Sequence, residues 1–351
     1  MEVSTPGRIC LFGEHQDYLG LPVIAMAISL RASLVGERRT DNQIIIHLPD
    51  IGKTEIFSLN DTTYQGLRDY FKSGVNVCKQ EGLIFSNGFE CEIRSDIPIQ
   101  AGASSSSAIV VSWINFLSHM SDNNIVLSKE KIGELAYKAE VIEFSGPGGM
   151  MDQYITAIGN MIYIESEPEV SITLLDSRLS GFVLGDSGEQ KDTLNILKYC
   201  KNRRFEIIKK IRNQDPSFNL HSYNHRLESL ILSESEMNLF EGTIKNRDFL
   251  LQAKLELLKK DKDDERIGIL LNQHHAVLRD YLGVSTPKIE DMINAASEAG
   301  SLGNKINGSG GGGCMFAYAP GRQEEVADAI KSVGGEAYLI NIDEGTKIIN
   351  F

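Results

Sequence analysis

The first third of the chain alternates short apolar runs with polar turns, which is the pattern of β-strands. One segment alternates polar with apolar residues, and the others are short continuous apolar runs. The strand-like segments are residues 22–28, 32–37, 43–48, 55–59 and 89–95. Residues 63–82 instead have apolar positions at helical spacing and end near a glycine. We therefore expect a β-sheet with one helix in this part of the chain.

Farther along, the periodicity becomes mainly helical. Residues 106–120 and 128–144 have helical spacing, and a glycine-rich break at residues 145–153 leads into another helix start. A strand-like run follows at residues 160–166. Later segments are predicted as a long helical stretch interrupted by polar residues (193–296), a glycine-rich loop feeding an apolar strand (303–320), a helix (322–334) and a last strand (336–342). This order predicts an α+β fold rather than regular βαβ alternation.

At 351 residues the chain exceeds the usual size of a single core, so two domains are expected. The pattern changes between residues 170 and 190. We therefore predict an N-terminal domain at residues 1–180 and a C-terminal domain at residues 181–351.

Composition and charge narrow the class of protein. The chain is 42% hydrophobic and 24% charged, with no apolar run long enough for a membrane span and no signal-peptide pattern at the N-terminus. A formal net charge of −13 argues against nucleic-acid or anionic-membrane partners. The five cysteines are scattered without metal-site spacing, which suits reduced thiols in the cytoplasm. A cytoplasmic protein that binds small molecules is the expected class.

A serine-rich loop gives the strongest local signal for anion binding. Gly102 and Ala103 precede four serines, Ser104 to Ser107, just where an apolar helix begins. Glycine permits a positive φ, and a helix N-terminus offers unpaired N–H groups to an anion. Helix capping needs only one serine, so four favour a phosphate site. The loop is not a Walker A sequence, which disfavours a P-loop ATPase.

Two other stretches concentrate polar or glycine residues. Residues 307–314 hold five glycines in eight positions, which suggests close approach of the backbone to a ligand or a tight entry into a strand. Paired with the serine loop, this run suggests a nucleotide held from two sides. At the N-terminus, Arg8 is followed by an apolar run and then by Glu14, His15 and Asp17. The apolar run predicts a buried strand that places these polar side chains.

Three segments, in order, resemble the signature motifs of the GHMP small-molecule kinases. They are residues 7–20, 98–108 and 305–314, and they span nearly the whole chain. The first of them, and residues 146–155, are most similar to galactokinases. The resemblance implies a two-domain GHMP kinase fold. Its N-terminal domain is expected to be like ribosomal protein S5 domain 2, its C-terminal domain to be ferredoxin-like, and the active site to lie between them.

The implied activity is transfer of the γ-phosphate of Mg·ATP to the anomeric hydroxyl of a monosaccharide. By resemblance, Asp152 is the catalytic aspartate and Arg8 its partner. The residues matching sugar ligands are Glu14, His15, Asp17 and Tyr18. Those matching the ATP phosphate loop are Gly102, Ala103, Ser104, Ser105, Ser106 and Ser107. Ser106 and Glu140 match the Mg²⁺ ligands, and a monomer or weak homodimer is expected.

The chemistry of these residue types agrees with phosphoryl transfer. Such a reaction needs positioning, neutralised phosphate charge and an oriented nucleophile. Mg²⁺ takes one or two protein oxygens and keeps several waters, so one glutamate and one serine suffice. Asp152 can accept a hydroxyl proton, and Arg8 would keep that carboxylate ionised. Simpler interpretations also stand: Asp152 as a helix cap, Glu140 as a solvated helix carboxylate and His15 as a structural histidine.

Several positions differ from the galactokinase pattern. Cys10 replaces an asparagine, Ala103 and Ser107 replace a leucine and an alanine, and the third motif is closer to that of mevalonate and heptose kinases. Galactose is the first candidate acceptor. A uronic acid, arabinose, N-acetylgalactosamine or a heptose phosphate remain alternatives, as does a catalytically silent regulator that binds sugar and ATP. Cys10 and Cys314 lie in apolar contexts and are expected to be small buried residues.

Overall fold

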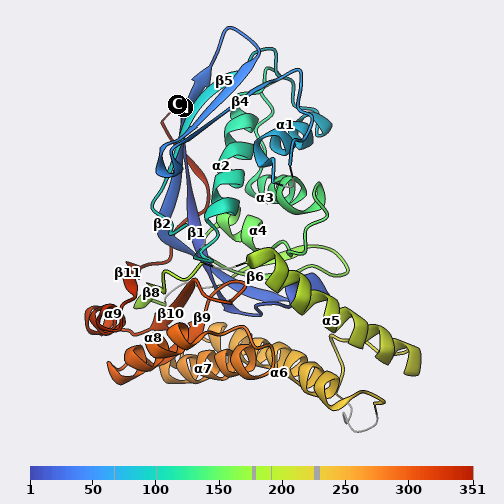
Figure 1. Cartoon of the computed structure of the whole chain (residues 1–351), viewed down its shortest axis with the longest axis vertical. Coiled ribbons are helices and arrows are strands. Elements are labelled where there is room, and N and C mark those ends of the chain that lie inside the picture. Colours follow the sequence, from blue (N-terminus) through green and yellow to red (C-terminus); the bar gives the residue numbers. More distant parts are fainter. Residues whose placement is uncertain (67, 100, 176–178, 191, 225–229, 351) are drawn as a thin grey trace.

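The computed structural model describes residues 1–66, 68–99, 101–175, 179–190, 192–224 and 230–350. The chain forms an eight-stranded sheet and a four-stranded sheet, each packed against helices (Figure 1). The larger sheet contains β1 (Glu2–Phe12), β2 (Val23–Arg38), β3 (Gln43–Leu48), β4 (Lys53–Ser58), β5 (Phe89–Ser95), β6 (Met161–Glu165), β7 (Ser171–Leu175) and β12 (Lys347–Asn350). The predicted α+β class is confirmed.

Strand β2 lies at the centre of the larger sheet, where it pairs with β1, β5 and β6. The order is β12-β1-β2-β5-β3-β4, with β6 pairing β2 and β7 pairing β6. The sequence predicted two strands between residues 22 and 37, but the structure has one strand of 16 residues. Residues 29–31 contain no glycine or proline that would break the extended backbone. The apolar run after Arg8 is buried in β1, as predicted.

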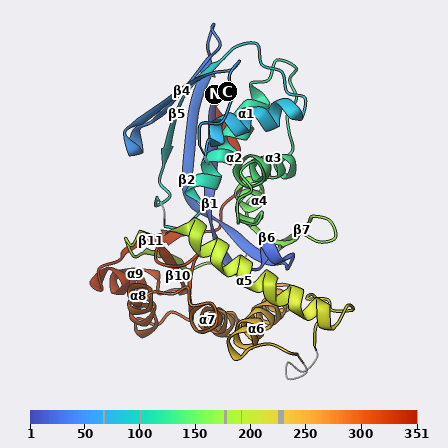
Figure 2. The same ribbon diagram turned by 45° about the vertical axis from the view of Figure 1, so that its right-hand side comes forward.

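Helices cover one face of the larger sheet (Figures 1 and 2). They are α1 (Tyr70–Gln80), α2 (Ser105–His119), α3 (Lys129–Tyr137) and α4 (Met151–Ile158). Helix α2 packs directly against β1 and β2. The helix predicted at residues 63–82 begins later, at Tyr70, and the one predicted at 128–144 continues past α3 as a π-helical turn, Lys138–Ile142. Strand β7 was not predicted.

The smaller sheet carries the C-terminal helices. It is antiparallel, in the order β11-β8-β10-β9. Its strands are β8 (Phe182–Asp186), β9 (Gly303–Ile306), β10 (Cys314–Tyr318) and β11 (Glu336–Ile340). The helices of this part are α5 (Thr193–Gln214), α6 (Glu234–Leu257), α7 (Asp264–Asp280), α8 (Pro287–Glu298) and α9 (Gln323–Ser332). They include the predicted helical stretch 193–296, of which residues 225–229 lie outside the described residues.

The end of the chain returns to the larger sheet. Strand β12, which was not predicted, pairs antiparallel with β1, and Ile342 bridges to Ile28 of β2. The division at residue 180 stays a prediction, and this last strand belongs to the sheet of the N-terminal part. Within the described part of the chain, no helix has the length and hydrophobicity that crossing a membrane requires. All five cysteines are buried.

Candidate active site

A cavity of about 470 Å³ lies where β1, the start of α2, the start of α4 and the glycine-rich third loop meet. This volume is within the range of small-molecule sites. Every predicted site residue of the first and second motifs lines it, except Ala103. An apolar part of the lining comes from β3 and its following turn, from α1, from β5 and from the segments around the serine loop, and comprises Leu48, Ile51, Phe71, Ile93, Ile99 and Ile109. This apolar part of the lining was not predicted from the sequence.

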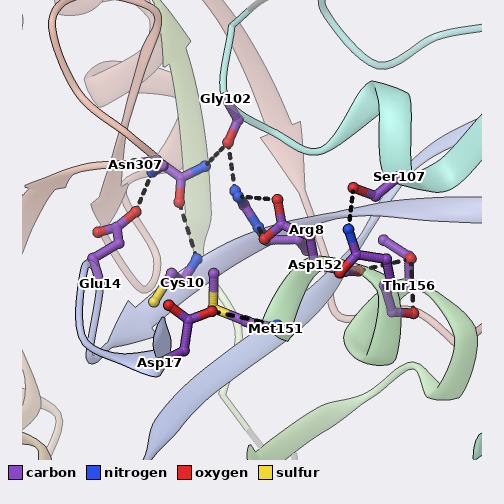
Figure 3. Close-up of polar contacts among 12 residues, drawn as sticks. Arg8, Cys10, Glu14, Asp17, Gly102, Ser107, Met151, Asp152, Thr156 and Asn307 are labelled. Atoms are coloured by element: carbon purple, nitrogen blue, oxygen red, sulfur yellow. Dashed lines mark hydrogen bonds and ion pairs between the residues drawn. The ribbon is translucent and has the colours of Figure 1, made fainter. Parts of the chain in front are cut away.

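Arg8 and Asp152 meet in the cavity although 144 positions separate them in the chain (Figure 3). Arg8 Nε donates to Asp152 Oδ1 at 2.8 Å and Nη2 donates to Oδ2 at 2.9 Å, a two-pronged pairing that fixes the carboxylate plane. Arg8 Nη1 donates to the carbonyl oxygen of Gly102. Burial opposes the charge of Arg8, but the Asp152 carboxylate raises its pKa overall.

Asp152 is placed by the first turn of α4, where the helix dipole favours a negative charge. Its side chain is 30% exposed, whereas that of Arg8 is 4% exposed. The carboxylate therefore faces the cavity while its cationic partner is held in the protein. This arrangement can orient a hydroxyl group and accept its proton.

Glu14 lies in a tight turn that follows β1, and its side chain points away from solvent. Its carboxylate forms an ion pair with Lys305 of β9 and accepts the backbone N–H of Gly308. The side chains of Glu14 and Lys305 are 2% and 0% exposed. Burial lowers the pKa of the Lys305 ammonium to about 7. The sugar-binding role of Glu14 stays a prediction.

His15 and Tyr18 belong to a hydrogen-bond chain that crosses to α5. His15 Nε2 lies 3.0 Å from the carbonyl oxygen of Ser309, and Nδ1 lies 3.0 Å from the hydroxyl of Tyr18. Arg204 Nη2 in turn donates to that hydroxyl. Because a carbonyl oxygen only accepts, a neutral His15 carries its hydrogen on Nε2 and accepts from Tyr18 at Nδ1. Arg204 was not predicted, since it lies far along the chain in a helix with several other basic residues.

Asp17 stands beside the reacting groups. Its Oδ1 accepts the backbone N–H of Tyr18 at 2.9 Å, and its Oδ2 lies 3.5 Å from the N–H of Met151. A Cβ added to Gly149 would fall 1.9 Å from Oδ2, so the glycine-rich break packs directly on this carboxylate. Burial, followed by repulsion from Asp152, raises the pKa of Asp17 to about 6.

The serine loop begins α2 with an open N-terminus. Gly102 has a φ of +90°, a positive value of the kind that glycine permits, and Ser104 also has a left-handed φ of +63°. The Ser104 side chain makes no capping hydrogen bond, and its buried Oγ has no partner in the described structure. The loop thus combines unpaired helix N–H groups with serine hydroxyls at the cavity wall, which is the arrangement of a phosphate site. Its role stays a prediction.

Ser106 and Glu140 lie together at the same wall. Ser106 Oγ donates to Glu140 Oε1 at 2.8 Å, and Gln153 Nε2 donates to Glu140 Oε2 at 2.6 Å. Burial raises the pKa of Glu140, against the hydrogen bonds from Gln153, Ser107 and Ser106. Two neighbouring oxygen ligands of octahedral Mg²⁺ lie about 2.9 Å apart, so Ser106 and Glu140 fit this ion. No cluster of three His, Cys, Asp or Glu side chains suited to a metal occurs among the described residues.

The glycine-rich third loop packs against the serine loop. Asn307 Nδ2 donates to the Gly102 carbonyl at 3.0 Å, and Asn307 Oδ1 accepts the N–H of Cys10 at 2.9 Å. A Cβ on Gly308 would lie 2.9 Å from the Gly102 oxygen. The backbone of this loop thus approaches the serine loop closely, and its predicted approach to a ligand stays a prediction. Asn307 links all three motifs. Its place beside the glycines is the only feature of the sequence that could have indicated this role.

Comparisons with known proteins match both halves of the chain to one family. The GHMP kinases N terminal domain matches residues 69–160, the GHMP kinases C terminal domain matches residues 254–336, and the galactokinase galactose-binding signature matches residues 2–38. The mevalonate kinase of Pyrococcus furiosus is 32% identical over 98% of this chain and 97% of its own. The galactokinase of Clostridium acetobutylicum is 26% identical over 99% of this chain and 94% of its own.

Solved structures share the whole fold. The galactokinase of Lactococcus lactis, complexed with galactose, has a TM-score of 0.86 at 21% identity, covering 99% of this chain and 94% of its own. The mevalonate kinase of Methanococcus jannaschii has a TM-score of 0.74 at 21% identity, with 98% of each chain covered. The predicted two-domain architecture is thereby confirmed. Family matches at both ends of the chain and a full-length relative above 30% identity establish that this protein belongs to the GHMP kinase family, whose members are ATP-dependent kinases of small molecules.

Proposed function

We propose that this protein transfers the γ-phosphate of Mg·ATP to the anomeric hydroxyl of a neutral monosaccharide, with galactose as the first candidate. The observation that carries the proposal is the Asp17 carboxylate beside Asp152 at the cavity wall. Two neighbouring carboxylates favour an acceptor rich in hydroxyl donors and repel one that is itself an anion. The galactose-binding signature over residues 2–38 supports the same class.

The cations at the cavity support a neutral acceptor. Among the described lining residues the only arginines or lysines are Arg8 and Arg68. Every hydrogen bond that the structure shows for the Arg8 side chain goes to Asp152 or Gly102. Arg68 is exposed and lies just before α1, beside Tyr70 and Phe71 of the lining. Among the lining residues that the structure describes, none therefore offers an unpaired cation to an acceptor carboxylate or phosphate at the Asp17 end.

In the proposed reaction Asp152 orients the acceptor hydroxyl and takes its proton. The hydroxyl oxygen bonds to the γ-phosphorus as the bond from that phosphorus to the β–γ bridging oxygen breaks, and ADP leaves. Arg8 holds the Asp152 carboxylate in one plane and places positive charge beside the transferring group. Because the transition state is loose, positioning by Asp152 contributes more than early proton removal.

The nucleotide is proposed to lie between the serine loop and the apolar lining. The open N-terminus of α2 and the hydroxyls of residues 104–107 would hold its phosphates. The apolar side chains near β3 and α1, Leu48, Ile51 and Phe71 among them, would contact the base. Ser106 and Glu140 would hold Mg²⁺, which supplies neutralisation of the phosphate charge.

A second candidate is a carboxylate-bearing hydroxy acid such as mevalonate. It is favoured by overall sequence identity, because several mevalonate kinases are 30–32% identical to this chain over nearly its full length. A sugar remains first because the acceptor end of the cavity presents Asp17 where an anionic acceptor would need a cation.

A coupled ADP-release assay with Mg·ATP tests the proposal across galactose, other monosaccharides, sugar acids, sugar phosphates and mevalonate. Turnover on a neutral sugar, lost in Asp152→Asn, is the expected result. Turnover on mevalonate alone would overturn the sugar assignment and leave the family intact. Ligand binding without turnover on any acceptor would identify a silent regulator instead.

A further inference from the structure

Gln153, the residue after Asp152 on α4, is a buried amide at the cavity wall whose bonding is incomplete. Its side chain is 3% exposed. Nε2 donates to Glu140 Oε2 at 2.6 Å and lies 3.4 Å from Ser107 Oγ. Its Oε1 is buried and has no hydrogen-bond partner within the described structure. Because a carboxylate only accepts, the amide nitrogen must face Glu140, and turning the amide over cannot satisfy Oε1.

The unpartnered Oε1 makes the Gln153 amide unfavourable for the stability of the folded protein. A buried carbonyl that lacks a partner destabilises the folded state, whereas an apolar side chain of the same size has no such penalty. A methionine would fill the same volume without a polar atom in need of a partner. The interaction that favours glutamine here is therefore its short hydrogen bond to Glu140.

Glu140 needs such support because of the backbone that carries it. It lies inside the π-helical turn Lys138–Ile142, which is closed by the N–H of Glu143 bonding to the carbonyl of Lys138 at 3.0 Å. π-turns are rare and occur mostly at functional sites. Ser73 of α1 donates to the Ala139 carbonyl at 2.7 Å and so stabilises the turn from the other side. The hydrogen bond from Gln153 fixes the Glu140 carboxylate itself.

We propose that Gln153 is the positioning residue of the magnesium-binding carboxylate Glu140, and that it is retained there at the expense of stability. One oxygen of Glu140 is held by Gln153 and the other faces Ser106 Oγ, so the metal-facing oxygen is oriented before the metal arrives. Since Gln153 follows Asp152 on α4, the same helical turn sets both the catalytic aspartate and the metal carboxylate. The inference rests on the proposed Mg·ATP chemistry but not on the identity of the acceptor.

The test compares Gln153→Met and Gln153→Leu with the native protein by two measurements. Mn²⁺ affinity of the protein–ADP complex is measured from the resonance of free Mn²⁺, and the melting temperature is measured without metal or nucleotide. We expect Mn²⁺ affinity to fall about tenfold, the lower range for loss of a ligand's supporting hydrogen bond. The melting temperature should stay the same or rise.

Asn115 offers a matched control, because it is another buried amide with an unpartnered oxygen, and it lies on α2 away from the cavity lining. Asn115→Leu should leave Mn²⁺ affinity unchanged. A lower melting temperature with native Mn²⁺ affinity in both Gln153 variants would overturn the proposal and show that the residue acts in packing. Glu140→Gln separates the two hypotheses: if it also leaves Mn²⁺ affinity unchanged, the proposed metal site itself is wrong.

Discussion

Glu14 and Lys305 form an ion pair that joins the first motif to the third and is almost wholly buried. Lys305 also donates to the carbonyl of Ile306 at 2.7 Å, and Glu14 also accepts the N–H of Gly308. The pair therefore anchors the turn after β1 to the start of the glycine-rich loop. Two loops that line the cavity from different parts of the chain are therefore both held by this ion pair.

Breaking this pair on one side should be strongly destabilising. Lys305→Met leaves the Glu14 carboxylate buried without its cation, and we expect the free energy of unfolding to fall by about 3–5 kcal/mol. Glu14→Gln leaves the ammonium unpaired and should have an effect of similar size. The double variant should recover much of the loss, because it buries no unpaired charge. Urea unfolding measures the free energy of unfolding of all three variants.

The exposed pair Lys53–Glu55 on β4 is the control. Lys53→Met should change stability by less than about 1 kcal/mol. A double variant as unstable as the worse single variant would show that the pair is not the source of the effect. If the folded double variant also keeps the native KM for the acceptor, the sugar-binding role predicted for Glu14 is wrong.

Asp17 should make both stability and acceptor binding depend on pH. Its pKa rises from 3.8 to about 6 because of burial and the nearby Asp152. Between these two values the folded protein binds more protons at this site than the unfolded chain does, so stability falls as the pH rises from about 4 to 6. Above about pH 6 the ionised carboxylate can accept two hydroxyl hydrogen bonds, so kcat/KM for the acceptor should rise through that pH.

Asp17→Asn removes the titrating group and should abolish both trends in denaturation and rate profiles. Asp328→Asn, on the exposed surface of α9, should leave both profiles unchanged. A rate profile that keeps its rise near pH 6 in Asp17→Asn would assign that rise to another group.

The guanidinium shape of Arg8 should matter as much as its charge. Lysine keeps the charge but cannot bond both oxygens of Asp152 and the Gly102 carbonyl at once. We expect Arg8→Lys to lower kcat about 100-fold through a misplaced carboxylate, while ATP binding changes little. Arg94→Lys, at an exposed side chain of β5, serves as the control. A native kcat in Arg8→Lys would show that charge alone is needed.

The predictable parts of this molecule are those with a local signal. The strands of the first third, the start of α2 and the positive φ of Gly102 follow from apolar spacing, small residues and glycine. The meeting of Arg8 with Asp152 was reached only through resemblance to a family, because no local pattern relates two residues 144 positions apart. The Glu14–Lys305 pair was missed because nothing around Lys305 in the sequence indicates that β9 is fully buried.

Two backbone features were also beyond the sequence. The π-turn at Lys138–Ile142 adds one residue to a helical period, and the spacing of residues 128–144 reads equally well as a continuous helix. Strand β12 has only four residues and is stabilised by pairing with β1 at the opposite end of the chain. Short strands stabilised by distant partners carry too few residues for a period to be recognised.

Gly308 should be required for ATP binding through its contact with the serine loop. Its φ is +77°, and a Cβ there would lie 2.9 Å from the Gly102 carbonyl, which also accepts from Arg8 and Asn307. Gly308→Ala must therefore displace the loop as well as strain the backbone. A displacement that removes about 1.4 kcal/mol of binding free energy raises the Kd for ATP about tenfold, and we expect calorimetry to measure at least this change.

Gly321 is the matched control for Gly308, because it has nearly the same φ, +76°, with no atom within 4 Å of the added Cβ. Gly321→Ala should consequently lose about 1–2 kcal/mol of stability from backbone strain and keep its ATP affinity. Equal Kd values for the two variants would mean that the contact between Gly308 and Gly102 does not shape the nucleotide site.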